Sequence, residues 1–283
     1  MIYGISIITT TGYPYYNKDY AIEPRNTMLK NLFFNYSKIR TQSTQETEFD
    51  LIAGLVSALF NFSFAQNRTI DELIYSRPEF EVEDLLDGET TMDTTVGTLI
   101  TVRCESYSIK TAVKRKLDYI HEKMIAALEP LNEKTNLAPS EEKLIHEILL
   151  SVPSKQLIRG HSKDLDTYLK KFIATNQTYG IRAVAITSSD LTILKTVGIT
   201  DENFQKVLRA VECPEVEPLT WKFRQAWAEN NEGVTLVFIN SAYNVTTETL
   251  QEPIYYLLLC DAYSALGDLP RSLFMDLNNI LAK

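Results

Sequence analysis

Two short fragments occur twice in this chain, and each pair falls at the same place in the order of predicted elements. IITTTG at 7–12 resembles AITSSD at 185–190, where a strand runs into a turn of small residues. CESYS at 104–108 resembles CDAYS at 260–264, where an apolar strand leads into an amphipathic helix. Chance matching of short fragments is the alternative. We interpret the echoes as duplication of one α/β unit, made of a hairpin, a helix, a short meander and a helix across the sheet.

The duplication makes a specific prediction about two tyrosines. Tyr107 and Tyr263 should occupy equivalent positions just before the last main helix of each unit. Two further pairs share the offset of this echo: Arg115 with Arg271, and Leu117 with Leu273.

The first half of the chain is predicted to follow the order strand, strand, helix, strands, helix. The stretch IYGISIITTTGYPYY at 2–16 is predicted to be the first hairpin, with a strand over Ile2 to Thr9 and Gly12 at the turn. The stretch 49–65 is predicted to be a helix buried on more than one side, because its small and polar positions form one narrow stripe. Three elements follow: a strand around TLITVRC, a periodic helix from Ile109 to Leu128, and a helix after the N-cap Ser140.

The second half begins after SVPSKQLIRGHSK and is predicted to open with a helix over 163–177. IRAVAIT and LTILKTV are predicted to form a hairpin around Ser188-Ser189-Asp190. Thr200 is predicted to cap a helix, and LTWKFRQAWAENN is predicted to be another helix. The strands VTLVFI and IYYLLLC follow, with a last helix beginning near Asp268-Leu269-Pro270.

These stretches resemble two related domain families. ISIITTTGYP with LIAGLVSALFNFSFA is similar to the longin domain, and GIRAVAITSSDLTIL with LLLCDAYSALGDLPRSL is similar to the roadblock domain. The resemblance implies an α/β (α+β) fold of two consecutive sheet-plus-helix domains, longin-like with inserts over 1–150 and roadblock-like over 151–283. It implies an antiparallel five-stranded sheet in each. One departure is Asp190-Leu191, where roadblock turns usually have Asp-Gly.

Composition excludes several classes of function. A net charge of −9 and a pI near 5.0 argue against nucleic-acid binding, which needs a positive surface. The N-terminal run lacks a basic leader and a cleavage site, and no stretch is as long as a membrane span, so we expect a cytoplasmic protein. Three widely spaced cysteines suggest neither disulfides nor a metal site. The Asn-x-Ser/Thr sequons are interpreted as chance.

No motif for catalysis or cofactor binding is recognised. His121, His146 and His161 have no metal-ligand spacing, and both phosphate-binding glycine motifs and GxSxG are missing from the sequence. Ser188-Ser189-Asp190 is interpreted as turn chemistry rather than a catalytic group. We therefore expect no catalytic, cofactor-binding or metal-binding residues and no cofactor.

Three surfaces could bind a partner. The helix at 49–65 has more apolar faces than one sheet needs, so a second domain covers it or a partner does. The basic and acidic clusters are interpreted mainly as solvated faces, with binding to an oppositely charged partner or membrane surface as the alternative. The basic cluster is Lys110, Lys114, Arg115 and Lys116; the acidic one is Glu79, Glu81, Glu83, Asp84, Asp87 and Glu89.

The resemblance implies a non-enzymatic interaction protein that binds and regulates a small GTPase, or scaffolds such a regulatory or vesicle-trafficking complex. The implied partners are a small GTPase or a homologous longin or roadblock subunit, and dimer formation and peripheral membrane association through partners are compatible with it. Two alternatives stay open. One is a structural coat or adaptor subunit that is insensitive to nucleotide state, and the other is an enzyme with an unrecognised carboxylate site.

Overall fold

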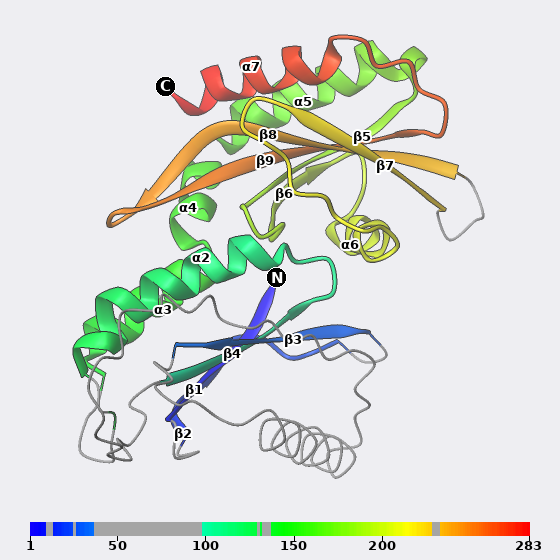
Figure 1. The fold of residues 1–283 in the computed structure, drawn as a ribbon. Coiled ribbons are helices and arrows are strands. Elements are labelled where there is room, and N and C mark those ends of the chain that lie inside the picture. The colour runs from blue at the N-terminus through cyan, green and yellow to red at the C-terminus, as the bar shows by residue number, and fades with distance from the viewer. Residues whose placement is uncertain (10–13, 25–26, 37–97, 129–130, 132–136, 228–232) are drawn as a thin grey trace, which may run out of the picture. The chain divides into compact units, whose positions relative to one another are not determined.

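The computed structural model describes residues 1–9, 14–24, 27–36, 98–128, 131, 137–227 and 233–283 (Figure 1). It contains two antiparallel sheets, of four strands in the order β2-β1-β4-β3 and of five in the order β6-β5-β9-β8-β7. Both sheets belong to one compact unit, formed by 1–37 and 96–283. The strands are β1 (Ile2–Thr9), β2 (Pro14–Asp19), β3 (Leu29–Asn35), β4 (Thr98–Glu105), β5 (Ile181–Thr187), β6 (Ile193–Val197), β7 (Trp221–Trp227), β8 (Gly233–Thr247) and β9 (Leu250–Asp261).

Helices connect and cover the sheets. Within the described residues, no helix combines the length and apolarity needed to cross a bilayer. The helix α2 continues into a π-helical turn at His121–Ile125 and then a 3₁₀ turn at Ala126–Leu128. The helices are α2 (Lys110–Ile120), α3 (Pro139–Leu149), α4 (Val152–Gly160), α5 (Ser162–Asn176), α6 (Asp201–Arg209) and α7 (Leu269–Leu281).

The four-stranded sheet buries one face under α2 and α3. Side chains alternate along β1, so Ile5 and Ile7 point to the covered face while Ser6 and Ile8 are only half-buried. The core beneath is aliphatic and continuous from sheet to helices. Its fully buried members include Ile100, Val102, Val113, Leu117, Ile120, Ile145 and Ile148.

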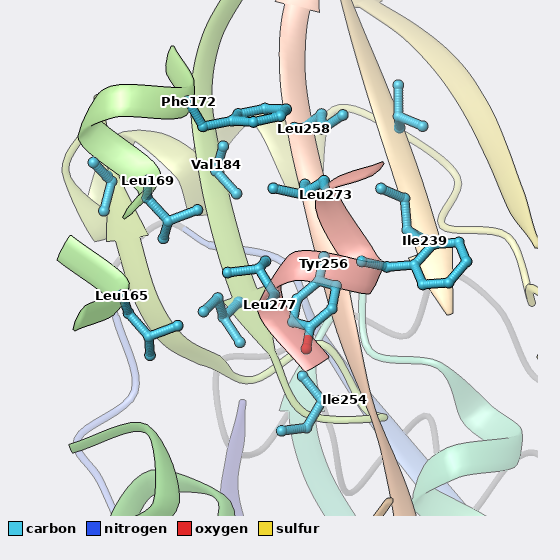
Figure 2. Close-up of a cluster of buried hydrophobic side chains, with 14 of the residues drawn as sticks. Leu165, Leu169, Phe172, Val184, Ile239, Ile254, Tyr256, Leu258, Leu273 and Leu277 are labelled. Carbon is cyan, nitrogen blue, oxygen red and sulfur yellow. The ribbon is translucent and has the colours of Figure 1, made fainter. Parts of the chain in front are cut away.

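The five-stranded sheet is covered on both faces. Figure 1 shows α5 and α7 side by side on one face and α6 on the other. Because both faces are buried, the central strands β8 and β9 read as nearly continuous apolar runs. In Figure 2, Leu165, Leu169 and Phe172 from α5 meet Leu273 and Leu277 from α7 over the sheet.

Corresponding strands of the two sheets lose register at corresponding points, which supports the interpretation of duplication. In each sheet the strand that comes first in the sequence pairs with the strand that comes last in the sequence. The register shifts between Ile2 and Gly4 where β1 meets β4, and between Ile181 and Ala183 where β5 meets β9. The ladders open with equivalent pairs, Ile2 with Cys104 and Ile181 with Cys260.

The two hairpins carry a second matching irregularity. The register shifts between Ile7 and Ile8 in the β1–β2 pair, and between Ile186 and Thr187 in the β5–β6 pair. Structurally, Ile7 therefore corresponds to Ile186. The alignment of IITTTG with AITSSD pairs Ile7 with Ala185 instead, so that echo is displaced by one residue.

Tyr107 and Tyr263 lie in equivalent turns, as predicted, but in opposite environments. The amides of Ser108 and Ser264 both donate to the carbonyl three residues earlier, at 3.0 and 3.3 Å. Tyr107 is only 3% exposed because it packs into a core cluster of the five-stranded sheet, whereas Tyr263 is 95% exposed. The turn at Tyr107 therefore lies in a buried junction, whereas the turn at Tyr263 lies at the surface.

The helices that follow these turns are not in the same register. The connection from β9 to α7 (262–268) is longer than that from β4 to α2 (106–109). The predicted pairs Arg115 with Arg271 and Leu117 with Leu273 therefore do not lie at the same distance from the start of their helices.

The prediction of a helix for LTWKFRQAWAENN was wrong, because Trp221–Trp227 form the edge strand β7. Aromatic residues recur there with period two, at Trp221, Phe223 and Trp227, which is the strand period. Only Ala226 of this strand is buried, so no core requirement produced a clear apolar alternation. An edge strand with exposed side chains lacks the apolar alternation from which half-buried strands are predicted.

Two other predictions need correction, and two elements were missed. Ser140 is not an N-cap: α3 begins at Pro139 after Ala138, whose amide donates to the Glu141 carboxylate at 2.6 Å. Two elements, β3 and α4, were not predicted. The first sheet has four strands among the described residues rather than five. The predicted strand Ile2–Thr9, the hairpin around residues 188–190, the Thr200 cap and the helix near Pro270 are confirmed.

Candidate functional site

A buried lysine joins the two halves of the chain. The Lys116 side chain is fully buried and donates to Asp190 Oδ2 at 2.9 Å and to Ser151 Oγ at 2.8 Å. A second carboxylate oxygen, Glu252 Oε1, lies 3.5 Å from Nζ. The lysine comes from α2, whereas both carboxylates come from the five-stranded sheet and its hairpin. A full positive charge therefore stabilises the contact between the halves.

The carboxylates of this cluster are also held by the turn that carries Asp190. Asp190 Oδ1 accepts from the Ser188 hydroxyl and from the Thr192 amide, the latter at 3.0 Å. Glu252 Oε1 accepts from the Ser189 hydroxyl at 2.7 Å. Buried charges need such additional bonds because their hydration has been removed. The Ser-Ser-Asp turn is thus an anchor for the junction.

The charges of the cluster shift one another's pKa values. Burial alone would raise the pKa of Asp190, but the Lys116 ammonium and the hydrogen bonds hold it well below its usual range. Burial opposes the charge on Lys116 as well, yet the two carboxylates keep its pKa above the ordinary value. Burial raises the pKa of Glu252, which Lys116 offsets only in part. The ion pair proper is Lys116 with Asp190.

Leu191 closes the turn in a conformation that favours glycine. Its φ is 65°, and its amide donates to the Ser188 carbonyl at 3.0 Å. The left-handed region costs a non-glycine residue roughly 1–2 kcal/mol. Glycine adopts this region without that cost, so the backbone at this position has a conformation typical of glycine. The Leu191 side chain is fully buried in the cluster with Phe204 and Leu208, which offsets the strain.

We expect Leu191→Gly to destabilise the protein by about 1–3 kcal/mol, measured by urea unfolding. Removing a buried leucine side chain costs about 2–5 kcal/mol, more than the strain that glycine relieves. Leu191→Ala, which keeps the strain, is the comparison and should be less stable than the glycine variant. A glycine variant more stable than the wild type would show that burial of the Leu191 side chain does not offset the strain in its backbone.

The hairpin β8–β9 continues beyond the rest of its sheet as a two-stranded arm, from Asn244 paired with Pro253 to Thr247 paired with Leu250 (Figure 1). Leu250, at the end of the arm, is buried in the core cluster of the four-stranded sheet. The adjacent Thr249 hydroxyl lies 3.2 Å from the Tyr119 hydroxyl of α2. Glu252 of the same arm approaches Lys116. One half of the chain therefore completes the core of the other.

A second charged cluster links the halves at the end of α6. The Glu105 side chain is fully buried and accepts two bonds from Arg209, Nε to Oε2 at 2.9 Å and Nη2 to Oε1 at 2.7 Å. The Tyr3 hydroxyl also donates to Oε1. Burial would raise the pKa of Glu105, but the bonds from Arg209 and Tyr3 hold it below its ordinary value. This bidentate geometry is the strong form of a carboxylate–arginine pair.

Exposed aromatic side chains line the edge strand β7. Trp221, Phe223 and Trp227 share one face, and Phe223 and Trp227 are 64% and 74% exposed. Phe223 lies opposite Val237 of β8, whose side chain belongs to the core that α5 and α7 cover. The aromatic side chains of β7 therefore extend the apolar face of the sheet beyond the part that α5 and α7 cover. Among the described strands β7 pairs only with β8, so its outer edge is unpaired.

The predicted basic cluster does not act as one surface. Lys116 is buried, and Lys114 pairs with Asp118 of the same helix at 2.7 Å. Lys110 and Arg115 are exposed, and Arg115 lines a cleft. The helix at 49–65 and the acidic cluster at 79–89 lie outside the described residues.

The three histidines have different surroundings. His121 stacks on Tyr36 with ring centroids 4.2 Å apart, and His146 meets Tyr20 edge-on at 5.5 Å. His161 lies between α4 and α5. In the part of the chain that the structure describes, no group of three or more His, Cys, Asp or Glu side chains could hold a metal ion.

Comparison with known protein families finds none that matches this chain, and comparison with curated proteins finds no relative. The functional interpretation therefore depends on the geometry of the residues themselves. The features that sequence reasoning missed are the buried junction and the aromatic edge.

Proposed function

We propose that this chain is a non-enzymatic interaction protein, of tandem longin and roadblock type, that binds and regulates a small GTPase or scaffolds such a complex. The exposed aromatic row of β7 carries the proposal. Tryptophan and phenylalanine dominate the binding energy of protein interfaces, and isolated surfaces seldom expose them side by side. The order β6-β5-β9-β8-β7, with α5 ahead of the sheet and α7 after it, is compatible with the roadblock resemblance.

An unpaired edge strand gives a partner two ways to bind. A strand of the partner can continue the sheet along β7 through main-chain hydrogen bonds. Its side chains can at the same time cover Trp221, Phe223 and Trp227. Natural proteins usually protect such edges, so an open aromatic edge indicates a surface that a partner covers.

The buried clusters support a role in recognition rather than catalysis. Lys116, Asp190 and Glu105 are held by groups of the chain itself and reach the surface nowhere. They fix the two halves as one body, so a partner meets a preformed surface. A regulator of this kind acts by binding one nucleotide state of the GTPase more tightly than the other, which shifts the equilibrium between the states.

The test is affinity capture from the native lysate with GDP, with a non-hydrolysable GTP analogue, and with nucleotide removed. A small GTPase retained best in one condition supports the proposal, and nucleotide-free preference would indicate an exchange factor. Preference for the GTP form would indicate an effector or activator of hydrolysis. Equal capture of the same partners in all conditions, with no GTPase among them, would favour a structural coat or adaptor subunit.

We expect Phe223→Ala and Trp227→Ala each to weaken binding of the captured partner about 30-fold or more. A central aromatic residue contributes about 2 kcal/mol or more to an interface. Both side chains are exposed, so the variants should unfold at the wild-type urea concentration. Tyr263→Ala, which removes an exposed aromatic side chain elsewhere, is the matched control and should bind normally. Unchanged affinity in both β7 variants would place the interface on another surface.

A further inference from the structure

A cleft of about 290 Å³ lies where α2 meets the arm of the five-stranded sheet. One wall is the start of α2, with Thr111 and Arg115, and the other comes from β8, β9 and the loop at 215–218. Neither half of the chain could form this cleft alone. Its volume corresponds to the small end of natural ligand pockets.

Hydrogen bonds join residues of β8, β9 and the 215–218 loop that line the cleft. The Asn240 amide donates to the Val216 carbonyl at 2.9 Å, and its oxygen accepts from the Ala242 amide at 3.1 Å. The Tyr255 hydroxyl donates to the same Val216 carbonyl at 3.3 Å. Ala242 also lines the cleft and has a φ of 54°, in the left-handed region. Non-glycine residues are held in that region chiefly where the surroundings over-determine the backbone, as they do at binding sites.

Two opposite charges line the cleft without pairing to each other. Arg115 forms no ion pair with any carboxylate in the described part of the chain. Glu215 lines the opposite wall, and its Oε1 accepts from the Thr111 hydroxyl at 2.6 Å. Asn244 also lines the cleft, and its side-chain amide has no hydrogen-bond partner among the described residues. The cleft thus offers a cation on the wall formed by α2, and an amide and a carboxylate on the opposite wall.

We propose that this cleft binds a small zwitterion of amino-acid size. Its carboxylate is recognised by the Arg115 guanidinium and the Asn244 amide, and its ammonium group by the Glu215 carboxylate. A guanidinium matches a carboxylate through two parallel hydrogen bonds, and a carboxylate accepts well from an ammonium group. A simple anion would place a negative charge close to Glu215, and a simple cation would place a positive charge close to Arg115. This site is independent of the proposed GTPase partner.

The experiment is thermal unfolding of the full chain with each standard amino acid at up to about 10 mM, which fills most of a site of millimolar Kd. Any amino acid that raises the midpoint is then titrated by calorimetry. Its amide and its N-acetyl derivative, which lack the carboxylate and the ammonium group, are titrated beside it. The variants are Arg115→Gln and Glu215→Gln, with Arg271→Gln on α7 as the control. All three side chains are exposed, and circular dichroism checks that the variants fold.

We expect at least one amino acid to bind, and each charge-removing variant and each derivative to bind at least about tenfold more weakly. The control should bind as the wild type does. The proposal is overturned if no amino acid shifts the midpoint, or if binding survives Arg115→Gln. Equal binding of the N-acetyl derivative, or full affinity in Glu215→Gln, would also overturn it and leave a plain anion site.

Discussion

Replacing Lys116 with methionine should lower the free energy of unfolding by about 3–5 kcal/mol. The substitution keeps the apolar stem but leaves Asp190 without its counter-ion in a fully buried position. Glu252, which is also buried, loses the positive partner that offsets part of the effect of burial. Urea unfolding followed by circular dichroism measures the loss.

Lys114→Met is the matched control for this prediction. Lys114 lies on the same helix and pairs with Asp118, but its side chain is half exposed. Exposed pairs of this kind contribute about 0.3–0.5 kcal/mol. The triple variant Lys116→Met, Asp190→Asn, Glu252→Gln removes all three charges and should recover part of the lost stability. If Lys116→Met were as stable as Lys114→Met, the ion cluster would not hold the junction.

Arg209→Met should cost about 3 kcal/mol near neutral pH, because it leaves the buried Glu105 carboxylate with Tyr3 as its remaining side-chain donor. The loss should depend on pH. The folded-state pKa of Glu105 lies below its ordinary value, so this group stabilises the fold above about pH 4 and the contribution is lost as the pH falls further. Without Arg209 the low pKa is lost, and the stability difference between wild type and variant should shrink on acidification.

Urea midpoints recorded between neutral pH and about pH 3 test this dependence. Arg271→Met, which removes an exposed arginine from α7, is the control and should follow the wild type at every pH. A stability difference that stayed constant with pH would mean that Arg209 contributes packing of its stem rather than its charge.

Period-two alternation made several strands predictable from the sequence. β1 alternates over its second half because one face of its sheet is buried, and the central parts of β5, β8 and β9 are nearly continuous apolar runs because both faces are. β7 was not predicted, because an edge strand with exposed aromatic residues shows neither the apolar alternation nor the continuous apolar run. The repeated CESYS and CDAYS turns were detectable because backbone hydrogen bonding conserves their form, although their surroundings differ.

The junction could not be predicted from spacing, because Lys116 and Asp190 lie far apart in the chain. One local signal was present. Lys116 lies on the apolar stripe of α2, three residues after Val113 and four before Ile120. A lysine at such a position must find buried carboxylates or leave the stripe. Because Lys116 also belongs to a run of basic residues with Lys114 and Arg115, it was interpreted by its charge rather than by its place on the apolar face of α2.

The arm of β8 and β9 has a consequence for the chain as it leaves the ribosome. The first sheet and α2 are synthesised early, but Leu250, which fills part of their core, is made long afterwards. Domains usually fold from the N-terminus as they emerge. Here the core of the early half stays incomplete until the arm has been synthesised. We therefore expect chaperones to bind nascent chains that end before residue 250 more strongly than they bind the finished protein.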